Sequence, residues 1–109
     1  MGRITLTPDV LELIAERFKA LAEPNRLRIL ASLRAGELTV GELVDATGLT
    51  QANVSKHLRT LHATGFVARR REGMNVRYRL ADQGVIVLCD LMCGRLESEH
   101  TRRARLIGA

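Results

Sequence analysis

Residues 39–64, TVGELVDATGLTQANVSKHLRTLHAT, decide the fold that we predict for this chain. Thr39 and Glu42 have the spacing of a capping box, in which each side chain accepts a free N–H at the start of a helix. We expect this short helix to end at Gly48, and Thr50 to cap a second helix directly afterwards. Two short helices joined by a tight turn predict a helix-turn-helix over 39–64.

The second helix of this pair presents polar and basic side chains that suit DNA. Apolar side chains hold the two helices together: Leu43, Leu49, Val54 and Leu58. Polar residues near the start of such a helix reach base edges and phosphates in the major groove. The predicted DNA contacts here are Thr50, Gln51, Asn53, Ser55, Lys56, His57 and Arg59. Plain helix surface is the alternative for the polar residues, and packing against the core is the alternative for His57.

The apolar period then changes from that of a helix to that of a strand. Residues 66–71 and 75–80 read as two strands around a turn at 72–74. Five arginines stand here against one acid, Glu72: Arg69, Arg70, Arg71, Arg77 and Arg79. So basic a hairpin after a helix-turn-helix predicts a wing over 66–80 that lies along a phosphate backbone. The individual DNA contacts predicted in the wing are Arg69, Arg70, Arg71 and Arg77. An ordinary edge strand, with cations that discourage pairing, is the alternative.

The flanking segments are helical by period and capping. One helix runs from Pro8 to about Ala22, and another opens at Pro24 and stops at Gly36. A last helix, 82–105, begins at the cap Asp82 and is apolar nearly all round in its first half. Such a helix needs cover on more than one side, and a second copy of the chain would supply it. The fold class is therefore mainly α, a winged helix-turn-helix of about five helices and a two-stranded wing, in one domain over 1–109.

Composition limits the classes of function. The net charge of +5 over 109 residues favours a polyanionic partner, either nucleic acid or an anionic membrane surface. Neither a bilayer-spanning stretch nor a secretory signal is evident, so we expect a cytoplasmic protein with no membrane partner. The two cysteines are too few for a disulfide framework or a four-thiolate zinc site. No catalytic set of side chains appears, so we expect no enzyme.

Several of these stretches together resemble the ArsR/SmtB family of bacterial repressors. They are FKALAEPNRLRIL at 18–30, LVDATGLTQANVSKHLRTL at 43–61, and the shorter segments 65–67, 70–73 and 78–80. The resemblance implies a homodimer through the first and last helices, bound to double-stranded operator DNA and released by an inducer. The two recognition helices would then enter adjacent major grooves about 34–36 Å apart. A winged-helix module that binds protein instead of DNA is the alternative, and the basic wing argues against it.

The metal sites of the best-known members of that family do not carry over. One of those sites has a Cys-x-Cys pair near the start of the third helix, where this chain has Thr39 or Val40 and Gly41. The other uses Asp, His, His and Glu along the last helix, where this chain has Asp82, Gly84, Arg95 and Ser98. Only the first acid of that second site is matched.

Cys89 and Cys93 remain as candidates for sensing. Their spacing places both sulfurs on one face of the last helix, and thiolates bind thiophilic metal or metalloid ions. Thiol oxidation or persulfide formation is a second interpretation, and packing without any cysteine-based sensing is a third. A disulfide within one helix would be strained, so oxidation favours a bond between chains. Other side chains of ligand type lie nearby, and none of them is selected as a ligand: Asp90, Glu97, Glu99 and His100.

Overall fold

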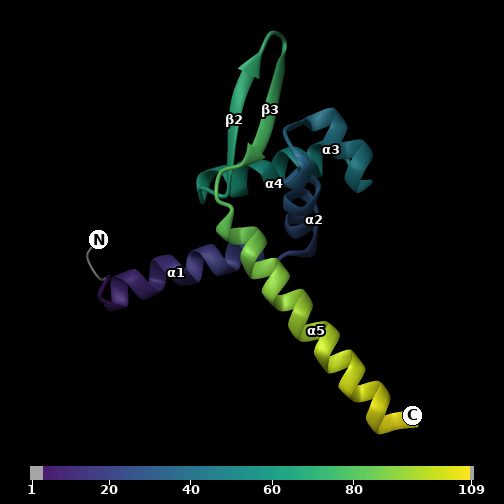
Figure 1. Cartoon of the computed structure of the whole chain (residues 1–109). Helices are drawn as coiled ribbons and strands as arrows, with labels where there is room; N and C mark the ends of the chain where they lie inside the picture. The colour runs from purple at the N-terminus through teal and green to yellow at the C-terminus, as the bar shows by residue number, and fades with distance from the viewer. Residues whose placement is uncertain (1–3, 109) are drawn as a thin grey trace.

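The computed structural model describes residues 4–108, and its helices and one hairpin confirm the predicted fold class (Figure 1). The elements are α1 Pro8–Leu21, α2 Pro24–Ser32, a 3-10 turn Leu33–Ala35, β1 Leu38–Thr39, α3 Val40–Thr47, α4 Gln51–Ala63, β2 Val67–Glu72, β3 Asn75–Leu80 and α5 Gly84–Gly108. The β2–β3 hairpin projects from one end of the body, and α1 and α5 extend as two arms from the other. Residues 1–3 and 109 of the predicted domain lie outside the described part.

Side-chain caps start the two helices of the helix-turn-helix where the sequence predicted them. The Thr39 hydroxyl accepts from the Glu42 amide at 3.2 Å, and the Glu42 carboxylate accepts from the Thr39 amide at 2.9 Å. The Thr50 hydroxyl accepts from the Asn53 amide at 3.2 Å and so opens α4. Gly48 ends α3 in the left-handed region at φ 74°, which an L side chain adopts only with strain. The helix-turn-helix is therefore fixed by local chemistry at each of its ends.

The hairpin is present with a shorter turn than predicted. Glu72 pairs with Asn75, so only Gly73 and Met74 form the turn, and β2 runs from Val67 through Glu72. Gly73 has φ 61°, the positive value that a two-residue hairpin needs at its first position. The sequence analysis missed a third strand, β1, which pairs antiparallel with β3 and makes the sheet order β1-β3-β2.

The hydrophobic core lies where α2, α3 and α4 meet the base of the hairpin. Leu43, Val54 and Leu58 are buried, and Leu49 packs against them, as predicted for the two helices. Burying side chains of this size stabilises a fold by about 1.5–3 kcal/mol each. This core holds α4 at a fixed angle to α3.

The two arms leave much of their apolar surface uncovered. The radius of gyration is 17.0 Å, against about 13 Å for a compact domain of this size. Phe18 of α1 is exposed, as are Leu91, Met92 and Leu96 of α5. Among the described residues of α5, Val85 is the one buried hydrophobic side chain. No helix in residues 4–108 is long and apolar enough to cross a membrane.

Candidate nucleic-acid interface

Helix α4 buries one face and presents the other to solvent. Val54, Leu58 and Leu61 face the core, at the spacing of one helical stripe. The predicted contacts Thr50, Gln51, Asn53, Lys56 and Arg59 are exposed, and Ser55 is half-buried. The exposed residues begin at the first turn of α4, where free N–H groups attract phosphate. The geometry therefore suits a helix that enters a groove by its N-terminus.

His57 does not belong to this surface. The residue is only 8% exposed, and its ring lies beside Glu23 and Arg26 at the junction of α1 and α2. Nε2 is 3.7 Å from a Glu23 carboxylate oxygen, and Nδ1 is 3.5 Å from the Arg26 guanidinium. Of the two interpretations offered by the sequence, the structure supports the packed histidine, and the predicted DNA contact is corrected.

Acidic side chains from outside the hairpin neutralise part of the wing. Arg70 and Arg77 are partners across β2 and β3 and share one face of the sheet. Arg70 donates to Glu37 at 2.8–3.0 Å and lies 2.8 Å from Glu72. Arg77 lies 3.4 Å from Glu72 and 3.6 Å from Glu42. The count of one acid for five arginines holds within the hairpin, and the fold adds two acids from outside it, Glu37 and Glu42.

These contacts shift the titration of the acids. Hydrogen bonds from Arg70 lower the pKa of the Glu37 carboxyl below its usual 4.5, and the charges of Arg70, Arg79 and Arg77 act in the same direction. The pKa of Glu42 is also lowered, first by the hydrogen bonds from Thr39 and then by the charge of Arg77. The pKa of Arg70 is raised by its bonds to Glu37 and Glu72. Arg70 and Arg77 are thus held in the wing by ion pairs with acidic side chains.

The remaining wing arginines are exposed. Arg69 and Arg71 lie opposite Tyr78 and Val76, on the other face from Arg70. Within residues 4–106, no ion pair involves Arg69, Arg71 or Arg79. These three guanidiniums are the wing cations most available to a phosphate backbone, and Arg79 was not among the contacts predicted individually.

The two cysteines lie in an apolar groove between the arms. Cys89 is half-buried and Cys93 is exposed, and both thiols are free. The groove holds about 420 Å³ and is lined by Phe18, Leu21, Ala22, Leu27, Val85, Leu88, Cys89, Leu91, Met92, Cys93 and Leu96. The described residues contain no group of three or more His, Cys, Asp or Glu side chains placed to hold a metal ion. The chain therefore offers two sulfurs in apolar surroundings.

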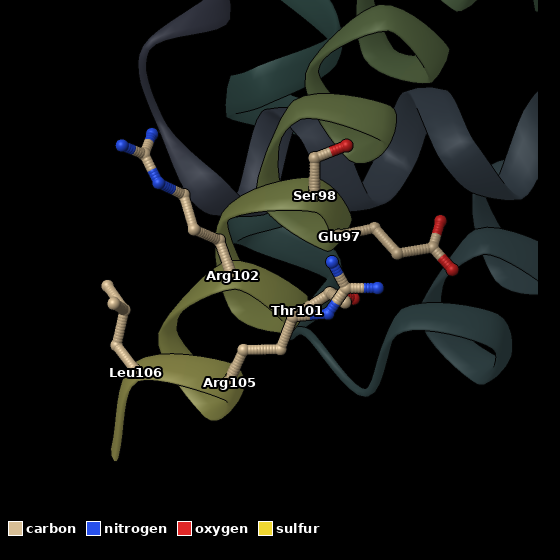
Figure 2. Close-up of a pocket in the computed structure, with 6 residues that line it drawn as sticks. All are labelled: Glu97, Ser98, Thr101, Arg102, Arg105 and Leu106. Carbon is tan, nitrogen blue, oxygen red and sulfur yellow. The ribbon is translucent and has the colours of Figure 1, made fainter. Parts of the chain in front are cut away.

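The other side chains considered as ligands lie elsewhere. Asp90 accepts two hydrogen bonds from the Arg34 guanidinium, at 3.0 and 3.3 Å, which ties α5 to the 3-10 turn after α2. Glu97, Glu99 and His100 are exposed on the outer turns of α5. Figure 2 shows a hollow in this region, lined by Glu97, Ser98, Thr101, Arg102, Arg105 and Leu106. These residues all belong to α5, so the hollow is open helix surface.

Comparison with known proteins agrees with this geometry. A model of the family described as "Bacterial regulatory protein, arsR family" matches residues 23–69. The chain is 45% identical over 74 residues to the HTH-type transcriptional repressor SmtB of Mycobacterium tuberculosis, a match that covers 68% of this chain and 55% of the repressor. The chain thus spans little more than half the length of this relative. Such relatives are described as transcriptional regulators, in agreement with the expectation of no enzyme.

Solved structures extend the similarity over nearly the whole chain. One is the homodimeric winged helix-turn-helix DNA-binding domain of Mb0332 from Mycobacterium bovis, "a possible ArsR-family transcriptional regulator". It is 34% identical with a TM-score of 0.75, and the match covers 94% of each chain. The AntR antimony-specific transcriptional repressor is 30% identical with a TM-score of 0.77, over 93% of this chain and 92% of AntR.

Proposed function

This chain belongs to the ArsR family of bacterial regulatory proteins, and we propose that it is a homodimeric repressor that binds operator DNA and releases it on meeting an inducer. The observation that carries the proposal is the surface formed by α4 and the wing. Polar side chains occupy the exposed face of α4 from its first turn onward. Arg69 and Arg71 lie beyond it on strand β2 of the hairpin. A recognition helix for base edges and a basic wing for phosphates form one continuous DNA reader.

Base recognition and phosphate binding would fall to different residues. Gln51, Asn53 and Ser55 have side chains that donate and accept hydrogen bonds, as readout of base edges requires. Lys56, Arg59 and the free wing arginines carry charge and would bind phosphates whatever the sequence. The Thr50 hydroxyl is already used as the α4 cap, so its own contact would come from the first turn of the helix.

A second copy of the chain is the proposed cover for the arms. The groove between α1 and α5 is almost wholly apolar, and the exposed side chains around it extend along both arms. A contiguous apolar surface of this kind marks an association site. The homodimeric description of the Mycobacterium bovis neighbour supports this choice. Dimerisation would place two recognition helices on one operator.

Sensing would fall to Cys89 and Cys93. Both sulfurs line the groove where a second copy would dock, so a ligand held there would act directly on the proposed interface. Sulfur ligands favour thiophilic metal and metalloid ions over hard cations. The neighbour described as antimony-specific supports an inducer of that class. Thiol oxidation is the second candidate, because Cys93 is exposed.

The test is a mobility shift with two duplexes. One is the duplex that the protein enriches from a random pool, and the other is a shuffled duplex of equal length. We expect tighter binding to the enriched duplex and a steep fall in both affinities as salt rises, because bound phosphates release counterions. An affinity that is independent of salt, or equal for both duplexes, would contradict a sequence-specific DNA-binding function.

A further inference from the structure

We propose that Arg26 and His57 are positioning residues that fix the recognition helix α4 against the junction of α1 and α2, and that their contact requires a neutral imidazole. The inference rests on the proposed function, because it assigns these residues a part in operator recognition. Neither residue belongs to the exposed face of α4. Their effect on DNA would therefore pass through the position of the helix.

Arg26 binds the end of α1. Its Nε donates to the Ala20 carbonyl at 2.6 Å, and one terminal nitrogen lies 3.5 Å from the Lys19 carbonyl. Carbonyls in the last turn of a helix lack partners within that helix, and a guanidinium there also suits the helix dipole. The arm that would meet a second copy is thus bonded directly to the Arg26 side chain.

The same guanidinium reaches α4 through His57. Its other terminal nitrogen is 3.5 Å from His57 Nδ1. Arginine has no acceptor, so Nδ1 must be the acceptor and the imidazole proton must be on Nε2. Nε2 faces the Glu23 carboxylate, which also accepts from the Arg26 amide at 2.9 Å and caps α2. This contact therefore exists in only one tautomer of the neutral ring.

Helix α1 also bonds to the far end of α4. Arg17 donates to the Thr64 carbonyl, just beyond the last turn of the recognition helix. Helix α1 thus holds α4 near its middle through Arg26 and at its end through Arg17. A rotation of α1 in a dimer would be transmitted to α4 at two points.

A second proton on His57 would change this arrangement. The charged groups in contact with the ring come from α2 and its cap, namely Arg26 and Glu23, and Arg26 also bonds to a carbonyl of α1. Lys56 and Arg59 of α4 itself are exposed. Protonation at Nδ1 removes the acceptor and places a cation beside the guanidinium, whereas the ring keeps its attraction to Glu23. Arg26 would then keep its hydrogen bond to the Ala20 carbonyl of α1 and lose its contact with His57 of α4.

The experiment measures the affinity for the enriched duplex divided by the affinity for the shuffled duplex, between pH 8 and pH 5.5 at fixed salt. In the wild type we expect the ratio to fall about fivefold, the equivalent of one hydrogen bond. His57→Asn keeps an acceptor near Nδ1 but cannot be protonated, so its ratio should be high and flat. His57→Leu and Arg26→Lys should have a low ratio at every pH.

His62→Asn is the matched control, because His62 is an exposed histidine on the same helix. It should keep the pH profile of the wild type. A pH dependence that survives in His57→Asn, or a His57→Leu variant with an unchanged ratio, would overturn the inference.

Nitrogen NMR of the free protein supplies a readout without DNA. At pH 8, His57 should carry its proton on Nε2, and a proton on Nδ1 would refute the contact. If no duplex is enriched, the proposed function and the role in operator recognition fail together, and the NMR tautomer still decides whether the contact exists.

Discussion

The Arg70 guanidinium donates three hydrogen bonds of 2.8–3.0 Å to the carboxylate of Glu37, which lies 33 positions earlier in the sequence. Glu37 directly precedes β1, and Arg70 lies in β2, so the bonds span the width of the small sheet. A cation held in this way is less available to DNA than its neighbours on the other face. The wing therefore contains two kinds of arginine.

The first prediction separates these two kinds. Arg69→Ala and Arg71→Ala should each weaken binding to every duplex and reduce the slope of log affinity against log salt by about 1. Arg70→Ala is the matched control, and it should change the slope less while lowering thermal stability, because it leaves Glu37 without its partner. Equal slopes for Arg70→Ala and Arg71→Ala would show that the ion pair does not withdraw Arg70 from DNA.

The second prediction concerns base recognition. Gln51→Ala and Asn53→Ala should each cost about 1–3 kcal/mol on the enriched duplex and relax preference at one base position. The cap of α4 survives both changes, because Thr50 accepts from the Asn53 backbone amide. Lys56→Ala should instead weaken enriched and shuffled duplexes alike. Binding to single-base variants of the duplex checks this, and unaltered preferences in both variants would remove these residues from base readout.

The third prediction tests the apolar arms. Met92→Glu puts a charge into the groove between α1 and α5, and we expect it to shift the protein from dimer to monomer and weaken operator binding at least tenfold. Ser98→Glu, on the exposed outer part of the same helix, is the control and should remain dimeric. Light scattering after size exclusion gives the mass. A Met92→Glu protein that remains dimeric would place the interface elsewhere.

The fourth prediction concerns release by an inducer. Cys89→Ser and Cys93→Ser should bind the operator like the wild type, because both residues line the groove between α1 and α5 and neither is a proposed DNA contact, but they should not release it. The probes are arsenite, cadmium, Cu(I), peroxide and polysulfide, each titrated against the operator complex. Release by a metal ion alone favours ligation, and release by peroxide or polysulfide alone favours thiol oxidation. Unchanged release in both variants would assign the thiols to packing.

The fifth prediction follows from the lowered pKa of Glu37. A carboxyl with a lower pKa in the folded state stabilises the fold above the unfolded value of about 4.5, and this contribution is lost as pH falls through the folded value. The difference in Tm between wild type and Glu37→Gln should therefore be constant from pH 7 to about 5 and shrink below 4.5. Thermal melts from pH 7 to 3 test this, and a difference that grows on acidification would reverse the assignment.

Local signals made the helices predictable from the sequence. The contacts between distant segments could not be predicted in this way. The caps at Thr39 and Thr50 act within a single helical turn, so they can be recognised from the residue types at neighbouring positions. Strand β1 has two residues, too few to display an alternating pattern, and without it nothing brings Glu37 to Arg70. His57 was ambiguous because its partners Glu23 and Arg26 are more than 30 positions away.

Thr39 caps α3 with its side chain while its backbone pairs with Arg77 of the wing, and Glu42 of the same capping box lies 3.6 Å from Arg77. The first helix of the helix-turn-helix and the wing are thus joined at one residue, with no linker between them. In the proposed complex with DNA, this joint would fix the distance and the rotation between the major-groove contact of α4 and the phosphate contact of the wing. Inserting one base pair between those two contacts would rotate the phosphates that the wing binds away from it. The bases that α4 reads would stay in place.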